Sequence, residues 1–186
     1  MHTLLALALL LPQATATDTL QVRSGLYAGF GLGPAHLNYQ CDGCPEAGAA
    51  FATHAVVRVG TVVSPHFSVG VDLDFWRRQG NTDGAITPRL TATWYPALAS
   101  GGFLTAGVGI SQFHGVGYAD GPTERGSGPG AAIGVGYDLR IDRELSLTPA
   151  LSLSYSDFGT TYVVGLPERR GTSVWLLAFA IGLTWH

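Results

Sequence analysis

Few residues of this chain could carry chemistry. Its 186 residues include six histidines, two cysteines and 13 carboxylates, and all ten basic residues are arginines. Charged residues make up only 12% of the sequence, against roughly 25% in an average soluble domain. The formal net charge is −3, and a nucleic-acid-binding domain normally carries a basic stripe. This charge balance argues against a nucleic-acid partner.

The two cysteines could form either a disulfide or a metal site. Cys41 and Cys44 enclose Asp42-Gly43, which is a favourable turn sequence. In an exported protein two cysteines this close most often pair, so we expect a small disulfide. A zinc site needs about four ligands, and only His36 and His54 are near in the sequence. A thioredoxin-like redox motif would need a βαβ context. We therefore expect no metal and no cofactor.

A second candidate group could support hydrolysis. His114 is followed by Asp120 and Glu124, and Asp157 lies further along the chain. General acid–base catalysis needs such groups within hydrogen-bond reach of one another. A single histidine among loop carboxylates is a common pattern, so we expect no catalytic residues, and the enzymatic reading stays as an alternative.

The N-terminus has the features of an export signal. Leu4–Leu11 is a short apolar run, followed by the small residues Ala14 and Ala16. The run is too short for a membrane-spanning helix, which needs about 20 residues, but it suits a signal peptide with cleavage after Ala16. The alternative is a buried N-terminal helix. We expect residues 1–16 to be a cleaved signal peptide and residues 17–186 to form one domain.

The rest of the chain alternates between large apolar and small residues, which predicts β-strands. Leu145–Ser156 shows the pattern most clearly, with leucines alternating with Ser and Thr. No later apolar run is longer than a strand, and only helices and closed barrels satisfy every backbone group in lipid. We expect an all-β, closed, eight-stranded, antiparallel up-and-down barrel. Its strands are Gly25–Gly33, His54–Val63, Phe67–Arg77, Ala85–Tyr95, Gly102–Gln112, Gly130–Arg140, Leu145–Ser156 and Thr172–Trp185.

The expected connections alternate between short and long, as in outer-membrane barrels with short periplasmic turns and longer outer loops. An even strand number then places both termini on the periplasmic side. The short connections are Ser64–His66, Pro96–Gly101 and Ile141–Glu144. The long ones are Pro34–Thr53, Arg78–Gly84, Phe113–Pro129 and Asp157–Gly171.

The face with small residues is expected to point inward, because the lumen of an eight-stranded barrel is only wide enough to be filled by side chains. Charges within strands occur on this face, and unpaired charges there would be costly. Counting back from the Ser64–His66 turn places Arg58 opposite Asp72. We expect a lumen charge network of Arg58, Asp72, Asp74, Arg89, Asp138 and Arg140. The alternative is a solvated pair at the rim.

Aromatic residues cluster at both ends of the apolar faces, where membrane barrels carry aromatic girdles. The expected girdle residues are Phe67, Trp94, Tyr137 and Trp185 at the short-turn end, and Phe75, Tyr155 and Trp175 at the long-loop end. A soluble lipocalin-like barrel would also alternate, but with its apolar face inward.

This pattern resembles the small OmpA/OmpX-like outer-membrane β-barrels of diderm bacteria, and the C-terminal segment Ala180–Trp185 is similar to their assembly signal. The resemblance implies a location in the bacterial outer membrane and insertion by the barrel assembly machinery. Members of this family range from structural anchors to adhesins and a few enzymes. His66-Phe67-Ser68 is similar to the His-x-Ser pair of lipid A deacylases, but it lies at a short periplasmic turn.

We therefore expect an outer-membrane barrel with a plugged polar lumen and a structural or surface-interaction role, rather than a porin-like general diffusion pore. Its expected partners are membrane lipid and lipopolysaccharide, and the sequence leaves its oligomeric state open. Arg125, Arg169 and Arg170 either contact lipopolysaccharide headgroups or are solvated loop charges. The alternatives are an outer-membrane enzyme acting on lipid A or peptides and a secreted, soluble ligand-binding barrel.

Overall fold

The computed structural model describes residues 24–42, 48–80, 83–97, 100–116, 123–163 and 168–186. The expected signal peptide, Cys44 and Asp120 lie outside these residues. Among the described residues, no helix is long and apolar enough to cross a membrane.

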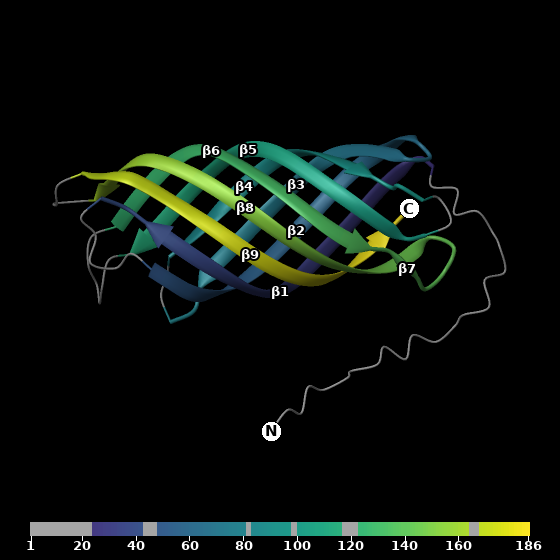
Figure 1. The fold of residues 1–186 in the computed structure, drawn as a ribbon, viewed down its shortest axis with the longest axis horizontal. Coiled ribbons are helices and arrows are strands. Elements are labelled where there is room, and N and C mark those ends of the chain that lie inside the picture. Colours follow the sequence, from purple (N-terminus) through teal and green to yellow (C-terminus); the bar gives the residue numbers. More distant parts are fainter. Residues whose placement is uncertain (1–23, 43–47, 81–82, 98–99, 117–122, 164–167) are drawn as a thin grey trace, which may run out of the picture.

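The described residues form one antiparallel sheet that closes on itself (Figure 1). Its strands are β1 (Leu26–Gln40), β2 (Gly48–Ser64), β3 (Phe67–Arg78), β4 (Gly84–Trp94), β5 (Gly102–Val116), β6 (Thr123–Tyr137), β7 (Leu139–Arg140), β8 (Leu145–Val163) and β9 (Arg169–Trp185). β6 and β7 are consecutive parts of one barrel strand, interrupted at Asp138, and both pair with β8. The expected closed, eight-stranded barrel is confirmed.

The barrel closes where β1 meets β9. The two strands pair from Ala28 opposite Trp185 to Gln40 opposite Ser173. Pro34 has no backbone N–H to give to the sheet, and this ladder is interrupted between Leu32 and Ala35. β1 nevertheless continues through Pro34, because that residue still pairs with Thr53 of β2.

Several strands extend further than expected at the long-loop end, which we call the outer end. β1 reaches Gln40 and β8 reaches Val163, so much of the expected loops Pro34–Thr53 and Asp157–Gly171 is strand. β8 accommodates an irregularity at Gly159, whose φ of 60° is in the left-handed region that glycine adopts readily. The inward-facing side chains of these extensions pack together and stabilise them.

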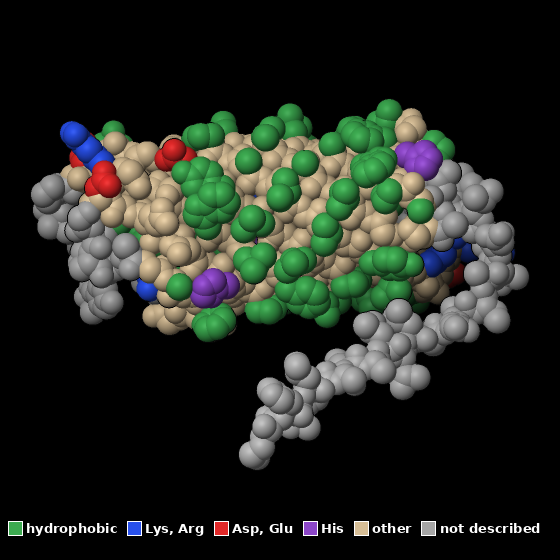
Figure 2. Space-filling model, in the orientation of Figure 1, with side chains coloured by type: hydrophobic (Ala, Val, Ile, Leu, Met, Phe, Trp, Pro, Cys, Tyr) green, Lys and Arg blue, Asp and Glu red, His purple; other side chains and the backbone are tan. Residues whose placement is uncertain are grey.

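The two faces of the sheet meet different environments. Apolar side chains such as Val71, Leu90, Val108 and Ile133 point outward and are exposed. They cover the middle of the barrel surface in Figure 2, and charged side chains gather toward its ends. Small and polar side chains such as Thr91 and Thr93 point inward and are buried. The inward orientation of the small-residue face agrees with the sequence prediction.

Candidate functional site

The lumen holds five of the six residues of the expected charge network. It contains a central charged cluster (His54, Arg58, Asp72, Asp74, Arg89), an inner polar cluster (Tyr95, Asp138, Thr148, Thr184, His186) and an outer apolar cluster. The outer apolar cluster consists of Ala35, Leu37, Tyr39, Ala52, Trp76, Ala85, Phe113, Phe158, Val174, Leu176 and Ala178.

Asp74 is the centre of the charged cluster. Arg89 Nη2 donates to its Oδ2 atom at 2.6 Å, and His54 Nε2 lies 2.8 Å from the same oxygen. Asp74 and His54 are 3% exposed and Arg89 is 6% exposed. A buried charge is tolerable only when it is paired and hydrogen-bonded, and β2, β3 and β4 together provide these partners for Asp74.

The Arg58–Asp72 pair lies next to it. The two residues are directly opposite each other in the ladder between β2 and β3, in the predicted register. Arg58 Nη2 is 4.0 Å from Asp72 Oδ2, and Thr91 donates a hydrogen bond of 3.2 Å to Asp72 Oδ1. Two arginines thus balance two aspartates inside the barrel.

Asp138 belongs to the inner polar cluster. Its carboxylate accepts hydrogen bonds from Tyr95 Oη at 3.1 Å and Thr148 Oγ1 at 2.9 Å. His186 Nε2 lies 3.9 Å from it. Asp138 is therefore buried in the lumen as predicted, but it lies apart from the Asp74 group.

The predicted position of Arg140 is wrong. It was expected in the lumen, but it is exposed on β7 and donates to the Arg143 carbonyl oxygen at 3.1 Å. The strand is interrupted at Asp138, so the alternation of faces that the sequence predicts does not extend to Arg140.

The outer apolar cluster was missed by the sequence prediction. Phe113 lies at its centre, with ring centroids 6.0 Å from Tyr39, 6.2 Å from Trp76 and 5.3 Å from Phe158. These rings are buried inside the barrel at the outer end, and Tyr39, Phe113 and Phe158 come from segments that were expected to be long loops. The sequence did contain a signal for this cluster, because apolar residues continue at every second position from Ala35 through Leu37 to Tyr39.

One small cavity lies in the lumen among the described residues. A cavity of about 40 Å³ adjoins the central charged cluster and is lined by His54, Arg58, Asp72, Asp74 and Arg89, among others. A single water needs a cavity of about 10–15 Å³. The cavity therefore has room for a few waters.

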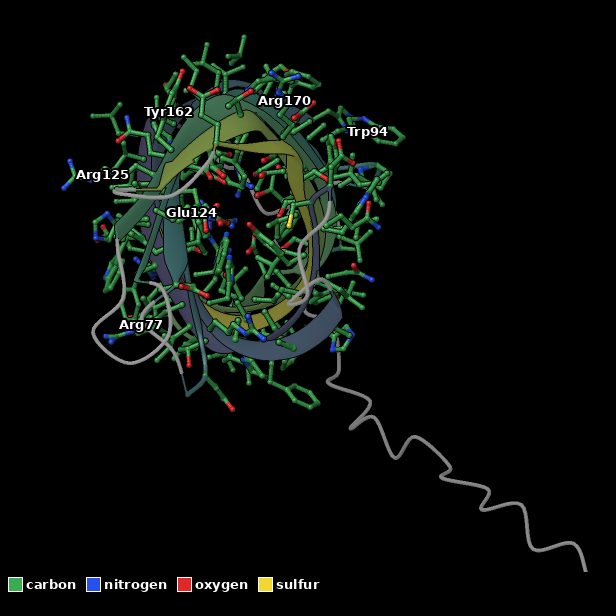
Figure 3. The ribbon with its side chains drawn as sticks, turned by 90° about the vertical axis from the view of Figure 1, so that its left-hand side faces the viewer. Arg77, Trp94, Glu124, Arg125, Tyr162 and Arg170 are labelled. Atoms are coloured by element: carbon green, nitrogen blue, oxygen red, sulfur yellow. The ribbon has the colours of Figure 1, made fainter. Side chains whose placement is uncertain are left out.

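Two members of the alternative hydrolytic group, Glu124 and His114, do not come together, and Asp120 lies outside the described residues. Glu124 points into the lumen (Figure 3), where it accepts hydrogen bonds from Tyr39 and Thr161. His114 faces outward on β5, opposite Arg125 of β6. The side chains of Glu124 and His114 thus lie on opposite faces of the sheet. Among the described residues, no group of three or more His, Cys, Asp or Glu could hold a metal ion.

His66 has a structural position at an inner turn. Its Nδ1 atom is 2.7 Å from the Tyr95 carbonyl oxygen. Ser68 is buried on the lumen face of β3. The His66 ring is therefore exposed at the turn, whereas the Ser68 side chain is buried in the lumen.

The expected girdle residues all lie on the outward face. Phe67, Trp94, Tyr137, Trp175 and Trp185 are exposed. Phe75 and Tyr155 are partly buried, and Tyr155 contacts Trp175 with ring centroids 4.7 Å apart. Their contact with a membrane interface stays a prediction.

Cys41 directly follows β1 in the first connection. It is disulfide-bonded and packs against the outer apolar cluster. Because Cys44 lies outside the described residues, the geometry of the expected pair stays a prediction.

The comparisons with known proteins concern the fold. No family model matches the chain, and no curated protein matches it. The crystal structure of Neisserial surface protein A (NspA) matches with a TM-score of 0.57 and 14% identity, over 87% of this chain and 97% of that one. The outer membrane protein OprG from Pseudomonas aeruginosa matches with a TM-score of 0.52 and 12% identity, over 90% and 100% of the two chains.

This chain has the fold of a small outer-membrane β-barrel. The match covers nearly the whole of both known structures, so the outer-membrane barrel accounts for essentially all of the described chain. At 14% and 12% identity, the similarity concerns the path of the backbone. The lumen clusters are properties of this sequence.

Proposed function

We propose that the protein is a non-enzymatic barrel of the bacterial outer membrane with a closed lumen, and that it acts structurally or through surface interactions of its outer loops. The observation that carries the closed lumen is the outer apolar cluster. Tyr39, Trp76 and Phe158 come from three different strands, and each contacts the Phe113 ring of a fourth strand inside the barrel.

Two further features support a closed lumen. The central charged cluster occupies the next part of the lumen and leaves a cavity of only about 40 Å³. Arg89 pairs with Asp74 at 2.6 Å, and His54 lies 2.8 Å from the same carboxylate, so opening a path would separate buried ions from their partners. Such separation costs several kcal/mol per ion. Both layers therefore oppose the passage of solutes.

The outward face supports a membrane location. Exposed apolar side chains extend around the barrel, and soluble monomers rarely expose apolar patches of more than a few hundred Å². We propose that membrane lipid and lipopolysaccharide cover this face, after export through a signal peptide at residues 1–16 and insertion by the barrel assembly machinery.

The non-enzymatic part of the proposal rests on access. His54 and Asp74 form a His–carboxylate pair 2.8 Å apart, which is an arrangement that enzymes use for general-base catalysis. Both side chains are nearly inaccessible, and Arg89 binds the same carboxylate oxygen. A substrate could not reach this pair while the lumen is filled.

The location is tested by fractionation. We expect the protein in the outer-membrane fraction, extracted by detergent and not by high salt or alkali. Its mobility on a gel should change on boiling, because a closed barrel resists unfolding in detergent at room temperature. Recovery of a folded protein in the aqueous fraction would contradict the proposal and favour the soluble ligand-binding barrel.

A further inference from the structure

A row of side chains crosses neighbouring strands at the outer end of the barrel. Arg77 of β3 lies opposite Gly84 of β4, which lies opposite His114 of β5. His114 lies opposite Arg125 of β6, and Arg125 lies opposite Tyr162 of β8. The side chains of Arg77, His114, Arg125 and Tyr162 are exposed, and Figure 3 shows Arg77, Arg125 and Tyr162 pointing away from the barrel axis. Arg125 is thus a strand residue, and not a loop residue as expected.

A surface hollow lies along the same row. It has a volume of about 750 Å³, and its lining includes His114, Arg125, Tyr162, Ser127 and Thr160. The ladder between β6 and β8 is interrupted here, between Arg125 and Gly130. Gly126 and Ser127 offer little side-chain volume on this stretch. The wall is therefore recessed beside two groups that can bind an anion.

Among the described residues, no carboxylate is part of the lining of the hollow. Glu124 is buried in the lumen, and Asp83 pairs with Arg78 at 3.7 Å. Asp157 accepts a hydrogen bond of 2.9 Å from the Gly159 amide and is not part of the lining of the hollow. The outward side of this row thus presents the guanidinium groups of Arg77 and Arg125, with the His114 imidazole on the strand between them.

We propose that this surface, the β5–β6–β8 hollow with Arg77 beside it, binds a phosphate group of lipopolysaccharide in the outer leaflet. The proposal rests on the outer-membrane location proposed above. Guanidinium groups bind phosphate through paired, charge-assisted hydrogen bonds. Strands in a sheet are about 4.8 Å apart, so Arg125 and His114 can reach one phosphate together, and Arg77 is two strands from His114.

The neighbouring residues suit a lipid rather than a free anion. Ile86 lines the hollow together with Tyr162, and amphipathic rings such as tyrosine prefer the level of lipid headgroups. Arg125 is thus expected to bind the phosphate while Ile86 contacts the first part of an acyl chain. Free inorganic phosphate would gain nothing from the apolar side of the hollow.

The test is the binding of lipid A to the purified protein in detergent micelles, followed by native mass spectrometry. The probe is diphosphoryl lipid A, compared with the same lipid after removal of its phosphates. We expect Arg125→Ala to weaken binding of the phosphorylated lipid about tenfold, as lost charge-assisted hydrogen bonds imply. The Arg77→Ala/Arg125→Ala variant should weaken it further, and neither should change binding of the dephosphorylated lipid.

Arg170→Ala is the matched control, since Arg170 is also exposed at the outer end but lies on β9. It should bind lipid A as the wild type does. Equal losses from Arg170→Ala and Arg125→Ala, or no loss from Arg125→Ala, would overturn the site. Heat-modifiable mobility of each variant shows that it is folded. The wild-type fractionation test of membrane location is a separate readout, so the two proposals can fail independently.

Discussion

Asp74 is the residue on which the buried charges of the lumen depend most. Its carboxylate binds both Arg89 and His54. We expect Asp74→Ala to lower the free energy of unfolding by about 3–5 kcal/mol, because it leaves the Arg89 guanidinium buried without a counter-charge. Urea unfolding of the barrel in lipid vesicles measures this loss. Asp142→Ala, at an exposed position of an inner turn, is the control and should change little.

Removing both charges distinguishes pairing from simple loss of contacts. The Asp74→Leu/Arg89→Met variant should recover much of the stability that Asp74→Ala loses, because apolar side chains of similar volume often replace a buried ion pair at little cost. A double variant less stable than Asp74→Ala would show that the charged cluster has another structural role.

At the residue scale, the sequence predicted the pairing of residues on strands that a short turn connects. The position of Arg58 opposite Asp72 follows from the tight turn between β2 and β3, and the structure has the same pair. Arg140 could not be placed in this way. The interruption at Asp138 is stabilised by contacts with Tyr95 and Thr148, which are distant from it in sequence and invisible to a periodic pattern.

At the element scale, closure of the barrel depends on close backbone approach between β1 and β9. A Cβ atom on Gly33 would lie 2.0 Å from the Phe179 carbonyl oxygen and 3.0 Å from the Ala180 Cα atom. We expect Gly33→Ala to destabilise the barrel by about 1–3 kcal/mol, as overpacking commonly does. The measurement is the fraction of protein with folded, heat-modifiable mobility after refolding into lipid.

Gly102→Ala is the matched control for this closure. The nearest atom to a Cβ on Gly102 is Ser100 Oγ at 3.5 Å, which is an ordinary contact. It should refold as the wild type does. If Gly33→Ala refolds equally well, the β1–β9 seam is looser than the structure indicates.

The lengths of these elements were only partly predictable. Gly, Pro and charged residues in Phe113–Pro129 are typical of loops, yet β6 begins at Thr123. Glu124 and Thr161 face each other inside the barrel and form a hydrogen bond, which supports strands at this level. Such a contact joins two segments far apart in sequence, and local composition does not show it.

At the scale of the whole molecule, the lumen contains layers of different chemistry. The inner polar cluster, the central charged cluster and the outer apolar cluster follow one another along the lumen. Alternation in the sequence predicted the closed barrel and its outward apolar face. It did not predict the apolar layer, because Tyr39 and Phe158 come from segments whose composition indicated loops.

Solute uptake by proteoliposomes tests the closed lumen most directly. Vesicles containing the wild-type protein should swell in sugar solutions no faster than empty vesicles. Trp76→Ala/Phe113→Ala removes two rings of the outer apolar cluster and should change swelling little, because the paired charges around Asp74 still fill the next layer. Combining it with Asp74→Ala/Arg89→Ala should raise the rate in variants that retain heat-modifiable mobility. Swelling of wild-type vesicles well above the empty control would contradict the closed lumen.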